Sequence, residues 1–229
     1  MRASAIIVAA GSGSRLGSVT PKAFIQLGSR SLLYYSLRTI AQVPALCEAV
    51  VTVPAGMEAA AGAEAARAGL KIPVKIAPGG IERQDSVRIG LALTGAESDC
   101  VVIHDAARPF ATPAMFDQAL RAASEHGAAI AAIAVADTLK RVESGAIVAT
   151  IPRAALYQAQ TPQAFRRDLL KRAHRHALEN NIAATDDADL VERIGASVRI
   201  VDGSPLNLKI TTPADLEIAQ ALVTLVRYS

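Results

Sequence analysis

Cysteine is scarce in this 229-residue sequence, which contains only Cys47 and Cys100. Two cysteines so far apart form neither a disulfide framework nor the closely spaced ligand pairs of a zinc site. We therefore expect both to be buried thiols of a protein that works in a reducing cytoplasm.

Long apolar runs are also missing. No stretch approaches the ~18 uninterrupted apolar residues of a membrane-spanning helix. Met1 and Arg2 lead directly into a short strand-like segment without a separate apolar core and a small-residue cleavage site, so we expect no secretory signal peptide. The sequence thus predicts a soluble protein that does not associate with membranes.

Acidic residues are absent from the amino-terminal segment, where the first is Glu48. The basic residues before it are Arg2, Arg15, Lys22, Arg30 and Arg38. The net charge of +3 for the whole chain is too small to indicate nucleic acid as a partner. The unopposed positive charge of this segment instead predicts a small anionic ligand.

What the chain does have is a series of short apolar runs rich in strand-forming residues, with helical periodicity between them. These runs are residues 5–10, 49–54, 74–77, 100–105 and 128–135. Strands that are apolar without alternation belong to a sheet covered on both faces. We therefore predict an α/β fold, a Rossmann-like and mostly parallel sheet flanked by helices, in a single domain over residues 1–229.

The pattern changes near residue 138. The segment TLKRVESGAIVATIPR predicts two short strands of alternating polarity around Ser144 and Gly145. This hairpin is expected to leave the main body as an arm at about residues 138–160. Helical periodicity resumes near Gln163, and Thr212 is expected to cap a final helix.

A basic helix is expected after the arm. Phe165, Leu169 and Ala173 would mark its buried stripe. Its basic residues are Arg166, Arg167, Lys171, Arg172 and Arg175. They predict a solvated face rather than a nucleic-acid patch.

Glycine and serine are concentrated in residues 6–24, IIVAAGSGSRLGSVTPKAF, directly after the first predicted strand. Backbone N–H groups of such a loop bind phosphate well. The Walker pattern fails because Gly17 is followed by Ser18 rather than lysine. A dinucleotide loop fails because Gly11, Gly13 and Gly17 have the wrong spacing and no acid follows at the ribose position.

The pattern that fits is the nucleotidyltransferase loop, in which a glycine-rich turn is followed by an arginine and then by Pro-Lys. Here these residues are Arg15, Pro21 and Lys22. Pro21 restricts the backbone before Lys22 and so helps to direct the cation. A plain turn with incidental surface charges is the alternative.

Two further polar segments follow predicted strands, where ligands of parallel sheets bind. In PGGIERQDS, Gly80 offers a backbone amide and Ser86 a hydroxyl for base recognition, with Arg83 nearby. The alternative is a helix start capped by Asp85 or Ser86.

In HDAARP, Asp105 is suited to Mg²⁺, which favours few protein oxygens plus phosphate. The alternative is a turn-capping Asp105 that pairs with Arg108. We expect His104 to be a packing residue. In TDDAD, Asp187 and Asp189 suggest a metal site, but acids at a helix start are the more common explanation.

Taken in order, AAGSGSRLG, PKAF, GGIERQDSV, HDAARP, DTLKR, TPQAF, TDDA and NLKITTP closely resemble the 2-C-methyl-D-erythritol 4-phosphate cytidylyltransferases of the non-mevalonate isoprenoid pathway. The likeness covers nearly the whole chain. It implies a Mg²⁺-dependent enzyme that transfers CMP from CTP to methylerythritol phosphate and releases pyrophosphate. The product is 4-diphosphocytidyl-2-C-methyl-D-erythritol.

The resemblance also implies roles for individual residues. Those expected at the cytidine are Ala9, Ala10, Gly11, Gly80 and Ser86. Arg15 and Lys22 would bind the triphosphate, and Asp105 would lie by the ribose and the metal. Those expected at the sugar phosphate are Arg153, Thr161, Thr185 and Lys209. The expected binding set is completed by Arg83, Ala106 and Arg108.

In such a family the arm reaches across a homodimer, so Arg153 and Thr161 would serve the neighbour's site. The nucleophile is a phosphate that is mostly dianionic at neutral pH. No general base is needed, which agrees with the lack of a nucleophile, histidine and acid set. A nucleotidyltransferase for another polyol phosphate and a non-catalytic nucleotide-binding module remain the competing functions.

Overall fold

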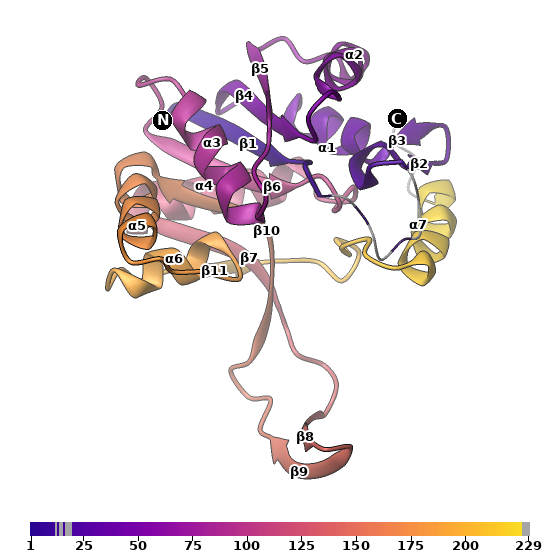
Figure 1. Ribbon diagram of the computed structural model, residues 1–229, viewed down its shortest axis with the longest axis vertical. Helices are drawn as coiled ribbons and strands as arrows, with labels where there is room; N and C mark the ends of the chain where they lie inside the picture. Colours follow the sequence, from indigo (N-terminus) through magenta and orange to yellow (C-terminus); the bar gives the residue numbers. More distant parts are fainter. Residues whose placement is uncertain (12, 14–15, 17–19, 226–229) are drawn as a thin grey trace.

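The computed structural model describes residues 1–11, 13, 16 and 20–225. In this part of the chain, seven strands form a central sheet in the order β11-β7-β10-β6-β1-β4-β5 (Figure 1). They are β1 (Ala3–Val8), β4 (Leu46–Val53), β5 (Val74–Pro78), β6 (Cys100–Asp105), β7 (Ala128–Ala134), β10 (Tyr157–Arg166) and β11 (Arg199–Asp202). All neighbouring pairs are parallel except those of β10, which runs antiparallel to β6 and β7. The predicted mostly parallel α/β sheet is confirmed.

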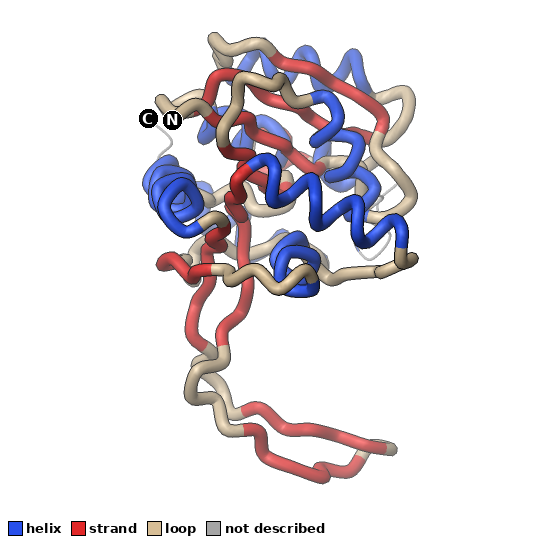
Figure 2. Tube along the Cα trace, turned by 90° about the vertical axis from the view of Figure 1, so that its left-hand side faces the viewer, coloured by secondary structure: helices blue, strands red, loops and turns tan. Residues whose placement is uncertain are grey.

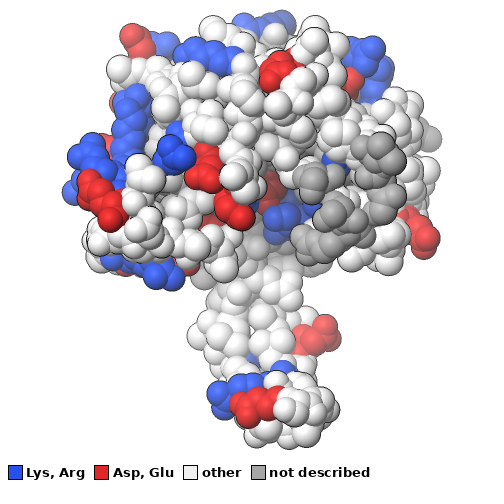
Figure 3. All heavy atoms as spheres, in the orientation of Figure 1, with Lys and Arg blue, Asp and Glu red and all other residues white. Residues whose placement is uncertain are grey.

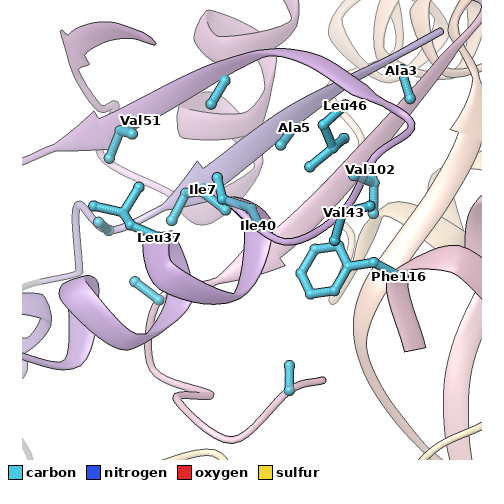
Figure 4. Packing of buried hydrophobic residues seen from close by; sticks show 14 of the residues in the cluster. Ala3, Ala5, Ile7, Leu37, Ile40, Val43, Leu46, Val51, Val102 and Phe116 are labelled. Atoms are coloured by element: carbon cyan, nitrogen blue, oxygen red, sulfur yellow. The ribbon is translucent and has the colours of Figure 1, made fainter. Parts of the chain in front are cut away.

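Helices cover both faces of the sheet (Figure 2). On one face lie α1 (Leu32–Ile40), α2 (Glu58–Ala68) and α4 (Pro113–His126), and on the other α3 (Arg83–Leu93), α5 (Arg167–Glu179) and α6 (Asp187–Arg193). Strand β1 contributes Ala5 and Ile7 to the first layer and Ile6 to the second. Figure 4 shows Leu37 and Ile40 of α1 packed near Ile7. Because both faces are buried, the strand needs no polar alternation.

The carboxyl-terminal helix packs against the amino-terminal part of the chain. Helix α7 (Pro213–Leu225) contacts the short hairpin of β2 (Gln26–Leu27) and β3 (Arg30–Ser31). The Gln220 side chain accepts from the Gly28 amide at 2.9 Å and donates to the Gln26 carbonyl at 3.1 Å. Thr212 accepts from the Asp215 amide, which confirms the predicted cap.

The predicted hairpin arm is present as β8 (Leu139–Glu143) and β9 (Ala146–Ile151). Ser144 and Gly145 form its turn, both with positive φ. Figures 1 and 2 show the arm projecting from the body as a continuation of β7 and β10. Tyr157 at the end of this segment pairs with Ala134, so the strands β7 and β10 of the main sheet continue into the arm.

The predicted helix near Gln163 is wrong at its start. Residues 163–165 pair with both β6 and β7, and α5 begins only at Arg167. Phe165 therefore lies in a strand, yet it is buried in the same layer as Leu169 and Ala173. Because Phe165, Leu169 and Ala173 face the same buried layer, their spacing of four residues looked like the period of a single helix.

Two of the basic residues at this junction also bond to main-chain carbonyls. Arg166 donates to the Ser124 carbonyl at 2.7 Å, and Arg167 donates to the Thr94 carbonyl at 3.1 Å. Cys100 is buried and Cys47 is half-buried, and both are free thiols. Among the described residues, no helix is long and apolar enough to cross a membrane.

Replacing Phe116 by alanine should lower the free energy of unfolding by about 3–5 kcal/mol, because a fully buried aromatic side chain would leave a cavity between α4 and the sheet. Chemical denaturation monitored by circular dichroism measures the change. Leu178→Ala is the control, since Leu178 is 61% exposed and should cost less than about 0.5 kcal/mol. Equal losses in the two variants would contradict the assigned core.

Candidate active site

The glycine-rich loop follows the carboxyl end of β1. Gly13 has φ +72°, and a Cβ there would lie 2.8 Å from the Lys22 Cβ, so only glycine fits. Lys22 begins the short helix η2 (Lys22–Phe24), directly after Pro21 with ψ 138°. The loop backbone and Lys22 therefore lie in direct contact. Arg15, the other predicted cation of this loop, lies outside the described residues.

The second loop joins β5 to α3. Glu82 caps α3 and forms a capping box with Asp85, so neither Asp85 nor Ser86 is the N-cap considered as the alternative. A Cβ at Gly79 would lie 2.3 Å from the Ala10 Cβ. Because glycine has no Cβ, this loop can lie directly against the first one. The Gly80 amide donates to the Ser86 hydroxyl at 3.1 Å. Both groups proposed for base recognition are therefore already partners within the loop.

Together these loops and the end of β6 line a pocket of about 280 Å³. The predicted residues that line it are Ala9, Ala10, Gly11, Lys22, Gly80, Arg83, Ser86, Asp105, Ala106 and Lys209. Sequence reasoning missed Thr211 and Ala107, which also line it. Both lie within segments that carry the resemblance, HDAARP and NLKITTP, but neither residue was given a role there.

Asp105 is the charged centre of the pocket. Its Oδ1 accepts from Arg83 Nε at 2.9 Å, and Lys209 Nζ lies 2.7 Å from its Oδ2. Burial would raise the pKa of Asp105, but the charges and hydrogen bonds of Arg83 and Lys209 hold that pKa well below its usual range. The carboxyl group is therefore ionised at neutral pH.

The expected alternative partner of Asp105, Arg108, points elsewhere. Its guanidinium donates to the carbonyls of Asn207 at 2.8 Å and Ala159 at 3.3 Å. Arg83 takes its place because α3 begins beside the end of β6, at a sequence distance that no local pattern reveals. The pairing of Asp105 with Arg108 is wrong.

A second pocket of about 210 Å³ adjoins the first. Its predicted residues are Arg83, Asp105, Arg108, Thr161, Thr185 and Lys209. Arg83, Asp105 and Lys209 line both pockets, so the two cavities meet at one cluster of charges. Gln163 and Asp186 also line the second pocket and are hydrogen-bonded at 2.8 Å; sequence reasoning missed both.

Thr161 lines the second pocket of its own chain, whereas the sequence predicted that it serves a neighbour's site. It is buried in β10, and its hydroxyl oxygen accepts from the Asp105 amide at 3.1 Å. Arg153, in contrast, lies on the arm, donates to the Ala136 carbonyl and lines neither pocket.

His104 is the packing residue that the sequence suggested. Its Nε2 lies 3.2 Å from the Arg108 carbonyl and must donate, so Nδ1 accepts from the Thr161 hydroxyl at 3.0 Å. The ring also packs on Phe116. Burial and the nearby arginines lower the pKa of His104 to about 4, although the Asp105 charge opposes them.

The D-x-D metal interpretation is not supported. Asp187 accepts from Arg83 and lies 3.2 Å from His174 Nε2, while Asp189 accepts from Arg193. The described part of the chain contains no group of three or more His, Cys, Asp or Glu side chains that could hold a metal ion.

The amino-terminal cations are not a common site either. Arg2 pairs with Glu97, and Arg30 lies over the Tyr34 ring, so within the described residues only Lys22 of this set lines the pocket. The number of basic residues before Glu48 therefore predicted more positive charge around a ligand than the described residues supply.

His104 should stay neutral in the folded protein at pH 5. The unfolded chain takes up a proton near the ordinary pKa of 6.5, whereas the folded chain does so only near 4, so stability is full above pH 6.5 and falls between these values. An NMR titration of the imidazole resonances measures the charge. A ring that is protonated in the folded protein at pH 5.5 would refute the hydrogen-bond pattern assigned to it.

Comparisons with known proteins agree with the resemblance noted in the sequence. A family model described as "IspD: 2-C-methyl-D-erythritol 4-phosphate cytidylyltransferase" matches residues 3–225. A relative with that enzyme name from Deinococcus radiodurans is 46% identical, with 96% of this chain and 89% of that protein covered. Another from Acidobacterium capsulatum is 43% identical, with 96% of each covered.

Solved structures are similar over the same span. The 2-C-methyl-D-erythritol 4-phosphate cytidylyltransferase of Thermus thermophilus has a TM-score of 0.82 and 36% identity, with 98% of this chain and 100% of that chain covered. The 4-diphosphocytidyl-2C-methyl-D-erythritolsynthase of Anaerococcus prevotii has a TM-score of 0.85 and 29% identity, with 97% and 98% covered.

Proposed function

Because the chain belongs to the 2-C-methyl-D-erythritol 4-phosphate cytidylyltransferase family, we propose that its two adjoining pockets bind the two substrates of that reaction. The activity is CTP-dependent cytidylyl transfer to methylerythritol phosphate in isoprenoid biosynthesis. The observation that carries the residue assignment is the meeting of both pockets at Arg83, Asp105 and Lys209. A transferred phosphoryl group and its acceptor need such a shared boundary.

The larger pocket is the proposed CTP site. Ala9, Ala10 and Gly11 offer small side chains and backbone groups at the end of β1, where a phosphate or a base can approach the main chain closely. Gly80 and Ser86 border the same pocket and would contact the cytidine. We place the triphosphate against Lys22 and Arg15, and the ribose beside Asp105 and Ala106.

The smaller pocket is the proposed acceptor site. Arg108 and Lys209 supply positive charge for the phosphate, and Thr185 offers a hydroxyl group. The Thr161 hydroxyl proton is committed to His104. Thr161 can therefore only accept a hydrogen bond from a polyol hydroxyl.

The chemistry needs few acid or base groups. The acceptor phosphate has a second pKa of about 6 and attacks the α-phosphate of CTP without a general base. The obstacle is the approach of two anions and the charge that collects on the departing pyrophosphate. Lys22 and Lys209 line the space where this charge would develop.

A magnesium ion fits this site if its ligands come partly from the protein and partly from the substrate phosphates. Mg²⁺ is usually held by one or two carboxylates plus phosphate oxygens, and Asp105 is an ionised carboxylate in the pocket. Each of its oxygens has one cationic partner and retains a further lone pair. We propose that Asp105 holds the metal, which when bound would neutralise phosphate charge.

The arm supports a proposed homodimer. Its exposed side chains include Val142, Ile147 and Val148, at 54%, 66% and 48% exposure. Figure 3 shows few charged residues on the visible part of the arm between the body and the tip. Because an isolated two-stranded hairpin is only marginally stable, we propose that a second copy covers it. Arg153 would then serve the acceptor site of that second copy.

Replacing Lys22 by alanine should lower kcat roughly 100- to 1000-fold, because a preorganised positive group at the triphosphate is lost. Pyrophosphate release with CTP, Mg²⁺ and methylerythritol phosphate measures the effect, with ATP, GTP and UTP as substrate controls. Lys71→Ala, at an exposed position away from the pocket, is the matched control and should match the unchanged enzyme. Near-normal turnover of the Lys22 variant would remove this residue from the mechanism.

A mixture of Lys22→Ala and Arg153→Ala chains should recover activity that neither variant has alone. In a mixed dimer, the Arg153→Ala body keeps Lys22 and receives an intact arm from the Lys22→Ala chain. Up to half of the sites would then be complete. Verified mixed dimers that stay inactive would show that the arm does not complete the partner's site.

A further inference from the structure

A chain of paired charges runs from the pocket into the layer formed by α5 and α6. Lys209 and Arg83 contact the two oxygens of Asp105, at 2.7 and 2.9 Å. Arg83 also reaches Asp187, with its Nη1 2.7 Å from Asp187 Oδ2. The other oxygen of Asp187 lies 3.2 Å from His174 Nε2. Arg83 is thus held between two carboxylates, one inside the site and one behind it.

Asp187 and His174 are both buried, so their charged and polar groups need the partners just described. The Asp187 side chain is 1% exposed, and that of His174 is 3% exposed. A carboxylate so far from water is costly unless it is paired and hydrogen-bonded. Burial would raise the pKa of Asp187, but the Arg83 charge and the contacts with His174 hold that pKa below its usual value. Asp187 therefore remains an anion that attracts Arg83.

Asp187 itself lines neither pocket, whereas Arg83 lines both. The planar guanidinium has donors in fixed directions, so a partner on Nη1 also fixes where Nε points. Nε is the atom that meets Asp105. The orientation of a residue in the site is thus determined by a residue outside it.

We propose that Asp187, oriented by His174, is a positioning residue for catalysis that acts through Arg83. It holds Arg83 against Asp105 and so maintains the placement of Asp105 and Lys209 between the two substrates. This inference rests on the proposed assignment of the two pockets. It gives the TDDAD segment a function that needs no metal.

The test is a double-mutant cycle between Asp187→Asn and Arg83→Gln. Asparagine keeps the shape of Asp187 and removes its charge. We expect Asp187→Asn to lower kcat at least tenfold in the otherwise unchanged chain, and less than twofold when Arg83 is already glutamine. Unfolding midpoints are measured for every variant, and kcat is measured well below them. A merely structural role would lower the folded fraction by a similar factor in both backgrounds.

Asp189→Asn is the matched control. Asp189 lies on the same helix, but it pairs with Arg193 at the surface and its side chain is 27% exposed. We expect its kcat to stay within twofold of the unchanged enzyme. If Asp187→Asn does not fold, His174→Phe replaces it, because phenylalanine fills the ring volume and removes only the hydrogen bond. We expect a two- to fivefold loss of kcat that also disappears with Arg83→Gln.

The outcomes separate the two proposals. An unchanged enzyme that releases no pyrophosphate from CTP and methylerythritol phosphate would refute the proposed pockets. An active enzyme with additive effects of Asp187→Asn and Arg83→Gln, or with kcat of Asp187→Asn within twofold of normal, would refute the positioning role alone. Loss of kcat in the Asp189 control equal to that of Asp187→Asn would also refute it.

Discussion

The ion pairs of one buried carboxylate, Asp105, are the constraint on which the site depends. A charge at the end of a buried strand must be compensated, and here the compensation comes from Arg83 and Lys209. Arg83 begins α3, and Lys209 lies on the segment that follows β11. One electrostatic requirement therefore brings together three distant parts of the sequence at the edge of the sheet. The shapes of both pockets follow from that meeting.

Close backbone contacts at two glycines also shape the larger pocket. At Gly13 and Gly79 any side chain would collide with Lys22 or Ala10, respectively. Gly13 lets the glycine-rich loop fold back against Lys22, and Gly79 lets the loop between β5 and α3 approach the loop after β1, so both loops line one pocket. The pocket is therefore lined by small residues where the loops meet and by charged side chains where the strand ends, which suits the proposed nucleotide with its ribose beside Asp105 and its phosphates towards Lys22.

Much of this could be predicted from the sequence. Unbroken apolar runs indicated the two-sided sheet, and the order of polar segments after them indicated the edge where ligands bind. Long-range pairing could not be predicted. The insertion of β10 between β6 and β7 depends on partners about 30 to 60 residues away, so its residues imitated a helix. Asp105 likewise had a nearby candidate in Arg108 and a real partner in Arg83. Asp187 was marked by its motif, but its burial against α5 was not.

The packing of α7 on the β2–β3 hairpin determines when the site can form during synthesis. Gln220 bonds to the hairpin that follows Lys22, and Lys209 pairs with Asp105. A ribosome releases these late residues long after the sheet edge and the glycine-rich loop. The nascent chain can thus bury most of its core while the nucleotide pocket still lacks one wall. The site is complete only after Lys209 and α7 have left the ribosome.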